Sequence, residues 1–176
     1  HNLYKELLNF CTVDLSAFYF DVRKDSLYCD PKNSEKRKST IMLLNIILNS
    51  LLKWFAPILS FTTEEIYQLM IKKNKSIHLE RFLNFPKKFE NSALNEKWSQ
   101  LLKIRDLCNL SIEEKRANKE IGSSLEASLK VNLDKQSIET VKGIDLAELF
   151  ITSSVEIEKT VSEKIIVKTN KAKGNK

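Results

Sequence analysis

The sequence predicts a mainly α protein, in which a helical bundle over residues 1–122 precedes a small α+β subdomain over residues 123–169. Three Gly and three Pro in 176 residues favour long, uninterrupted helices. Apolar residues recur at helical spacing over most of the first two thirds of the chain. Strand-like alternation first appears at residues 128–133. Residues 170–176 are predicted to form a disordered basic tail.

Composition sets limits on the class of protein. Hydrophobic residues make up 42% and charged residues 30%, as in an ordinary globular domain. The formal charge of +6 permits a polyanionic partner but does not require one. No apolar run reaches the ~18 residues of a membrane span, so no membrane partner is expected.

The first helical stretch covers residues 12–30, TVDLSAFYFDVRKDSLYCD, and continues a pattern that begins at residue 2. Leu15, Phe18 and Val22 form an apolar stripe, and the aromatic residues are expected to be core. Pro31 ends this helix, because proline disfavours the α conformation in the residue before it.

The second helix is expected to begin at the N-cap Ser34 and to end near Pro57. Its apolar residues are so frequent that burial on more than one side is predicted. A third helix is expected after a capping box formed by Thr62 and Glu65. Residues 74–92 read as a connection packed along the bundle, and the lone His78 is interpreted as structural rather than as a metal ligand.

A long helix is predicted from Ser92, with Gly122 as its C-terminal stop. Beyond it, Ser128–Leu133 alternates as a half-buried strand does. Residues 137–150 are expected to be helical around Gly143. Two further short strands are predicted, at residues 155–157 and 161–167.

No catalytic or metal-binding arrangement is found in the sequence. Three glycines cannot build a phosphate-cradling loop. Cys11, Cys29 and Cys108 are widely separated, which indicates a reduced, cytoplasmic protein without a disulfide framework or a zinc site. From the residues alone, a helical protein-interaction scaffold and a helical nucleic-acid-binding domain both remain open.

A family resemblance favours the second alternative. The chain contains VDLSAFYFDVRKDSLYCD at 13–30, RKSTIMLL at 37–44 and APILSFTTEEIY at 56–67. IHLERF at 77–82, KEIGSSLEASL at 119–129 and DLAELFITSSVEI at 145–157 follow. This ordered set resembles the C-terminal anticodon-binding region of bacterial-type isoleucyl-tRNA synthetases, which are class I enzymes. The valyl and leucyl relatives, with a related helical domain, remain alternatives.

The resemblance implies a non-catalytic fragment of a longer aminoacyl-tRNA ligase. The parent enzyme would use ATP and Mg²⁺ in a catalytic domain and would carry an editing domain, both upstream. Zinc would belong to a cysteine-rich segment downstream, and this fragment itself would hold no cofactor. The expected partner is the anticodon stem-loop of tRNA(Ile), bound by a monomeric protein.

Lys and Arg at helix ends are the candidate tRNA-binding residues, because cations neutralise backbone phosphates. Arg116 and Lys119, beside the IGSS turn, are expected nearest the anticodon. The full candidate set is Arg23, Lys24, Lys36, Arg37, Lys38, Arg116 and Lys119.

Overall fold

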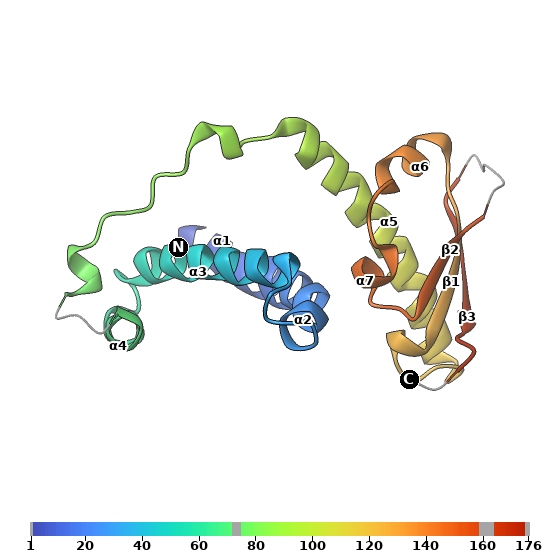
Figure 1. The fold of residues 1–176 in the computed structure, drawn as a ribbon, viewed down its shortest axis with the longest axis horizontal. Coiled ribbons are helices and arrows are strands. Elements are labelled where there is room, and N and C mark those ends of the chain that lie inside the picture. Colours follow the sequence, from blue (N-terminus) through green and yellow to red (C-terminus); the bar gives the residue numbers. More distant parts are fainter. Residues whose placement is uncertain (1, 72–74, 159–163, 175–176) are drawn as a thin grey trace. The chain divides into compact units, whose positions relative to one another are not determined.

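The computed structural model describes residues 2–71, 75–158 and 164–174 and confirms a mainly α fold with a small α+β part (Figure 1). Two compact units are present, and we describe each by itself. Unit 1 contains residues 1–22 and 90–176, and unit 2 contains residues 23–89. The predicted domain boundary after residue 122 remains a prediction, although one continuous core of unit 1 spans that position.

The N-terminal helical stretch is continuous but not uniform. It consists of α1 (Asn2–Asn9), a π-helix (Phe10–Phe20) and α2 (Asp21–Tyr28). The predicted stripe is confirmed, since Leu15 and Val22 are buried and Phe18 packs against the core, although a π-helix bonds residues five apart rather than four. The Thr12 hydroxyl donates to the Leu8 carbonyl at 2.9 Å, the acceptor that the Thr12 N–H would use in an α-helix.

The aromatic residues of this stretch differ in environment. Phe18 packs edge-on against Trp98, with 6.3 Å between ring centroids, as the core prediction requires. Arg105 lies 5.2 Å from the Phe18 centroid and donates to the Leu149 carbonyl, which ties the π-helix to two other elements of unit 1. The core prediction is wrong for Phe20 and Tyr28, whose side chains are exposed.

Helix α5 (Ser92–Ala117) is the central element of unit 1. It begins at Ser92 as predicted, and the Asn91 side chain caps it by accepting the Leu94 N–H at 3.0 Å. One face of α5 is completely buried, with Leu101, Ile104, Cys108 and Ile112 along it. The helix ends at Ala117, so the predicted stop at Gly122 is wrong.

A three-stranded sheet completes unit 1, in the order β2-β1-β3. The strands are β1 (Ala127–Asn132), β2 (Ser154–Ile157) and β3 (Ile166–Lys171). β1 pairs in parallel with β2 and antiparallel with β3. Side chains of β1 alternate between buried and less buried, which confirms the predicted strand.

Two corrections concern the C-terminal part. The predicted helix over 137–150 is two short helices, α6 (Lys135–Val141) and α7 (Leu146–Phe150), because Gly143 adopts φ 75° between them. The predicted tail is also partly wrong, since β3 runs through Lys171. The strand prediction at Val161 lies outside the described residues.

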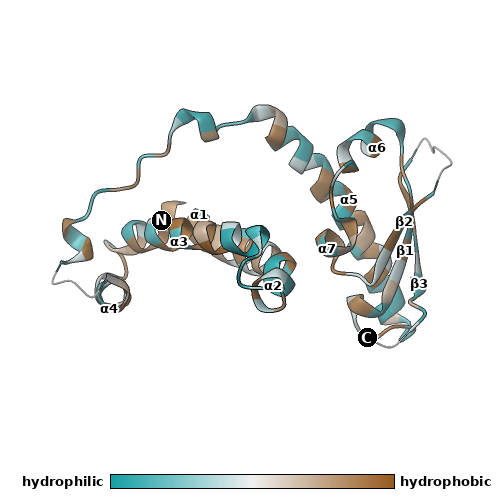
Figure 2. Cartoon of the chain, viewed as in Figure 1, coloured by the Kyte–Doolittle hydropathy of each residue, from teal (hydrophilic) through white to brown (hydrophobic). Residues whose placement is uncertain are grey.

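Unit 2 contains α3 (Glu35–Phe55) and α4 (Ser60–Ile71), followed by two single 3₁₀ turns, Ile77–Leu79 and Lys87–Phe89. Ser34 caps α3 as predicted, by accepting the Arg37 N–H. Burial of α3 on more than one side is wrong, because Ile41, Met42 and Leu43 are exposed. Figure 2 shows this apolar stretch of α3 and the hydrophilic start of the helix.

A small core joins α3, α4 and the first 3₁₀ turn. The capping box of Thr62 and Glu65 is wrong, since α4 begins two residues earlier, at Ser60. Glu64 instead accepts hydrogen bonds from the Ser76 hydroxyl and the Ile77 N–H, both at 2.9 Å. The hydrogen bond from the Gln68 amide, together with these two bonds, lowers the pKa of Glu64.

The predicted packing of the 74–92 connection holds for Ile77, which is buried, but is wrong for residues 81–90, which are all exposed. The His78 side chain is exposed. Within the described ranges no group of three metal-ligating side chains occurs. None of the helices seen there is long and apolar enough to cross a membrane.

Candidate nucleic-acid interface

The candidate cations of unit 2 lie on α2, on α3 and around the corner between them. This corner, residues 29–38, is held by hydrogen bonds. The Ser34 hydroxyl donates to Asp30 Oδ2 at 3.0 Å, and Arg37 Nη1 donates to the Asp30 carbonyl at 2.7 Å. Arg37 therefore stabilises the corner, a role that sequence reasoning did not assign to it.

Lys38 is held less firmly than Arg37. It is exposed, and among the described residues it pairs with the exposed Glu35, at 3.0 Å. An exposed ion pair of this kind contributes about 0–1 kcal/mol, so Lys38 can exchange it for a phosphate at little cost. Lys24 and Lys36 are also exposed, whereas Arg23 is half-buried.

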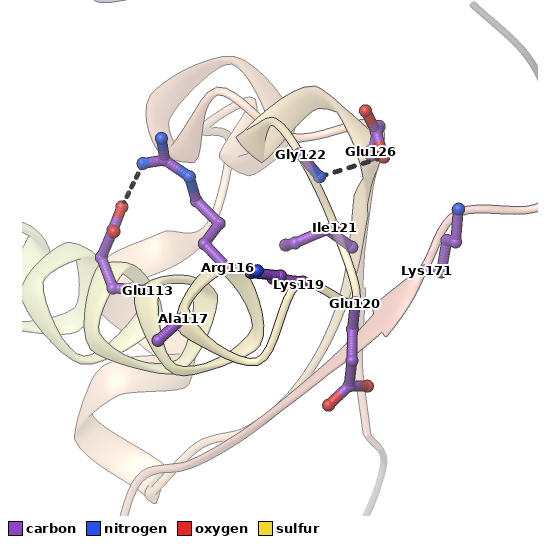
Figure 3. Close-up of a pocket in the computed structure, with 9 residues that line it drawn as sticks. All are labelled: Glu113, Arg116, Ala117, Lys119, Glu120, Ile121, Gly122, Glu126 and Lys171. Atoms are coloured by element: carbon purple, nitrogen blue, oxygen red, sulfur yellow. Dashed lines mark hydrogen bonds and ion pairs between the residues drawn. The ribbon is translucent and has the colours of Figure 1, made fainter.

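Unit 1 has a hollow of about 560 Å³ at the end of α5 (Figure 3). Its residues come from the last turn of α5, the following turn through Glu126, and the end of β3. It brings the predicted site residues Arg116 and Lys119 together. The lining residues are Glu113, Arg116, Ala117, Lys119, Glu120, Ile121, Gly122, Glu126 and Lys171.

The chain leaves α5 through a Schellman motif. The Lys119 N–H donates to the Arg116 carbonyl at 2.9 Å and the Glu120 N–H to the Lys115 carbonyl at 3.0 Å. Lys119 occupies the C′ position with φ 58°, in the left-handed region. Glycine is the usual residue there, and a side chain costs about 1–2 kcal/mol in that conformation. A cation near a helix C-terminus recovers about 0.3–1 kcal/mol of it.

The cations of the hollow fall into two groups. Arg116 pairs with Glu113 at 2.6 Å, and the adjoining Lys115 pairs with Glu120 at 2.8 Å. Neither Lys119 nor Lys171 has an ion pair within the described part of the chain. The hollow therefore offers two ammonium groups that are not neutralised by a neighbouring carboxylate.

The far wall of the hollow is fixed by local hydrogen bonds. Glu126 accepts the Gly122 N–H at 3.2 Å, as the dashed line in Figure 3 shows. The Ala172 N–H donates to the Glu126 carbonyl at 2.7 Å, and Lys171 pairs with Ala127 in the β1–β3 register. The strand thus places Lys171 beside the turn.

Lys171 is the lining cation that sequence reasoning missed. Residues 170–176 read as a basic tail, because they contain three lysines and no acidic residue. The buried Thr169, whose hydroxyl lies 2.7 Å from that of Ser111, shows that the strand continues. The apolar pattern does not alternate through Lys171, so the pairing with β1 is what identifies this end of the strand.

A mainly helical domain with exposed lysines and arginines at its helix ends has the features of a nucleic-acid-binding protein. A sequence profile described as the anticodon-binding domain of tRNA ligase matches residues 1–132. The chain belongs to this family of anticodon-binding domains.

Several curated proteins are similar to the chain. The isoleucine–tRNA ligase of Pelagibacter ubique (strain HTCC1062) is 64% identical over 176 residues, which are 100% of this chain and 19% of that protein. The isoleucine–tRNA ligase of Bartonella henselae is 40% identical over 158 residues, 89% of this chain and 16% of that protein. The one of Agrobacterium fabrum is 40% identical over 154 residues, 87% of this chain and 16% of that protein. The chain thus spans less than one fifth of the length of these relatives.

Proposed function

We propose that this chain binds the anticodon stem-loop of tRNA(Ile) as one domain of an isoleucine–tRNA ligase. The observation that carries the proposal is the 64% identity with such a ligase over all 176 residues, together with the family match over residues 1–132. The valyl and leucyl relatives and the helical scaffold have no comparable support. The domain would position the tRNA for ATP-dependent aminoacylation elsewhere in the parent protein.

The candidate cations suit this role chemically. Lysine and arginine side chains at helix ends bind phosphates, which fixes the register of an RNA without reading its sequence. Lys24, Lys36 and Lys38 are exposed on α2 and α3, and Lys119 is exposed after α5. We assign backbone contacts to these residues and to Arg23, Arg37 and Arg116. Reading of anticodon bases would require stacking and hydrogen bonds to splayed loop bases.

Further properties of the parent protein belong to the same proposal. ATP and Mg²⁺ would serve its catalytic domain, and zinc would be held outside this chain. A cytoplasmic, monomeric enzyme is the arrangement that we propose. On this account the 176-residue chain alone gives no ATP–pyrophosphate exchange with isoleucine.

A binding competition tests the proposal. The chain is titrated into a fluorescently labelled tRNA(Ile) anticodon stem-loop, and unlabelled stem-loops of tRNA(Ile), tRNA(Val) and tRNA(Leu) compete with it. A size-matched hairpin of unrelated sequence is the control. We expect the tRNA(Ile) stem-loop to compete best. Preference for the tRNA(Val) or tRNA(Leu) stem-loop would assign the chain to a relative, and equal competition by the unrelated hairpin would contradict the proposal.

A further inference from the structure

The backbone of Lys119 is the feature of the hollow that local structure does not explain. Lys119 takes the left-handed C′ position of the Schellman motif, where a glycine would be free of steric strain. A glycine is present three residues later, yet Gly122 is not in the left-handed region. The chain therefore keeps a side chain at a position where the side chain lowers stability.

No contact of the Lys119 side chain offsets this strain. The side chain is exposed and makes no hydrogen bond or ion pair to the described residues. Its neighbours differ, since Lys115 pairs with Glu120 and Arg116 pairs with Glu113. Its interaction with the C-terminal end of α5 recovers only part of the cost. Backbone strain that persists without local compensation is a characteristic of functional sites.

A second unpaired cation lines the same hollow. The β1–β3 register places Lys171 opposite Ala127, and the bond from the Ala172 N–H to the Glu126 carbonyl holds the end of β3 against the turn. Lys119 and Lys171 thus reach one hollow from two elements of a single compact unit. Two ammonium groups on opposite sides of an open hollow suit the successive phosphate diesters of an RNA backbone.

We propose that this hollow binds the phosphate backbone of the tRNA, with Lys119 and Lys171, on opposite sides of the hollow (Figure 3), each contacting a phosphate. Lys119 keeps its left-handed conformation because this places its ammonium group at its phosphate, at the expense of stability. The inference rests on the proposed function and adds to it a specific site and the residue Lys171.

The acidic residues of the hollow restrict how the anion sits. Glu113 and Glu120 already neutralise Arg116 and Lys115. Glu126 is the remaining carboxylate, and it accepts only the backbone N–H of Gly122 in the described structure. Glu126 therefore repels a backbone phosphate that enters the hollow. Glu126→Gln keeps an oxygen acceptor for Gly122 and should tighten RNA binding.

The test compares Lys119→Gly, Lys119→Arg and Lys171→Ala with the unmodified chain. Melting temperature is measured by circular dichroism, and affinity for the tRNA(Ile) anticodon stem-loop by fluorescence anisotropy over a range of salt. Lys103→Ala is the matched control, because Lys103 is an exposed lysine about four turns earlier on α5.

Lys119→Gly is expected to melt about 2–4 °C higher, because it relieves the strained backbone. Its RNA affinity should fall about threefold to tenfold. The slope of log affinity against log salt concentration should become smaller in magnitude by about 0.7–0.9, the value for one lost phosphate contact. Lys171→Ala should lose a similar factor in affinity. Lys119→Arg should bind RNA within about twofold of the unmodified chain, and Lys103→Ala should do the same.

The result expected for this site is a higher melting temperature together with a lower RNA affinity in Lys119→Gly. A Lys119→Gly variant that binds RNA as tightly as the unmodified chain overturns the inference and leaves the proposed function intact. A lower melting temperature for Lys119→Gly also overturns it, because the side chain would then be stabilising. Failure of the unmodified chain to bind the stem-loop removes the proposed function and this inference with it.

Discussion

The two compact units differ in how completely each buries its apolar side chains. Unit 1 has a cluster of 13 buried residues from α5, the sheet and the short helices, with several at 0% exposure. Among the described residues of unit 2, the buried cluster contains Leu52, Ala56, Tyr67 and Ile77. The middle of α3 in unit 2 is apolar but exposed, while Thr40 and Ser50 on the same helix are buried.

This difference in burial indicates that the two units are stabilised in different ways. Unit 1 obtains its free energy of folding from its own core, because burial of apolar surface is the dominant favourable term. Unit 2 buries less and depends more on capping and on hydrogen bonds such as those of Arg37 and Glu64. We therefore expect unit 2 to open more readily than unit 1.

The largest predicted effect is a cavity in the core of unit 1. Phe150→Ala removes a ring that is 2% exposed and should lower the free energy of unfolding by about 3–5 kcal/mol. Leu52→Ala, in the smaller cluster of unit 2, should cost about 2–3 kcal/mol. Urea titrations followed by tryptophan fluorescence measure both, since Trp98 reports on unit 1 and Trp54 on unit 2. The reverse order of costs would contradict the comparison.

The reaction rates of two cysteine thiols compare a buried side chain of unit 1 with an exposed side chain of unit 2. Cys108 is completely buried on α5, and burial raises the pKa of its thiol to about 12. Cys29 lies at the α2–α3 corner of unit 2 and is exposed. A disulfide reagent at pH 7.5 should therefore modify Cys29 at least about 100-fold faster than Cys108. With Cys11→Ser also present in both proteins, similar rates in the Cys29→Ser and Cys108→Ser variants would show that Cys108 is readily accessible, which contradicts its burial in unit 1.

Of the two proposed phosphate-binding cations Arg37 and Lys38 at the α2–α3 corner, Arg37 also has a structural role. Arg37→Ala should cost about 1–2 kcal/mol, because its side chain donates to the Asp30 carbonyl. Lys38→Ala should change stability by less than about 0.5 kcal/mol. Both variants should lose affinity for tRNA(Ile) and for other tRNAs alike. Equal melting temperatures for the two would show that the corner does not need Arg37.

The smallest effect concerns pH and Glu64. Hydrogen bonds hold the pKa of Glu64 below its usual value of 4.5 in the folded chain. A depressed pKa contributes stability above the unfolded value, and this is lost as pH falls through the folded value. The link between α4 and Ile77 should thus weaken below about pH 4. The protection factor of the Ile77 amide proton, which corrects the exchange rate for the intrinsic effect of pH, measures this loss when compared with that in Glu64→Gln. A protection factor that stays the same from pH 6 to pH 3 would contradict it.

Local signals in the sequence identified many of the elements. Ser34 caps α3, α5 begins at Ser92, and the alternating residues 128–133 contain most of β1. Each of these depends on residues close together in the chain, such as a side chain that bonds to an N–H three positions later. The candidate cations at the ends of α3 and α5 followed from those boundaries.

The errors occur where more distant or competing interactions decide. Gly122 has the residue type for a helix stop, but Lys119 takes the left-handed position instead. Lys171 joins β3 only through pairing with β1, about forty residues away. The π-helix over Phe10–Phe20 depends on hydrogen-bond spacing that apolar periodicity does not reveal. The dependence of β3 on its distant pairing with β1 is the reason that Lys171 was missed as a site residue.

The central claim is that exposed cations of both units bind the tRNA backbone, while the buried residues only support them. The most direct test is the salt dependence of stem-loop binding by the unmodified chain and by a Lys24→Ala, Lys38→Ala, Lys119→Ala triple variant. The account predicts a linear fall of log affinity with log salt, and a slope smaller by about 2–3 in the variant, whose three missing contacts each contribute 0.7–0.9. A slope near zero in the unmodified chain, or the same slope in both proteins, would contradict the account.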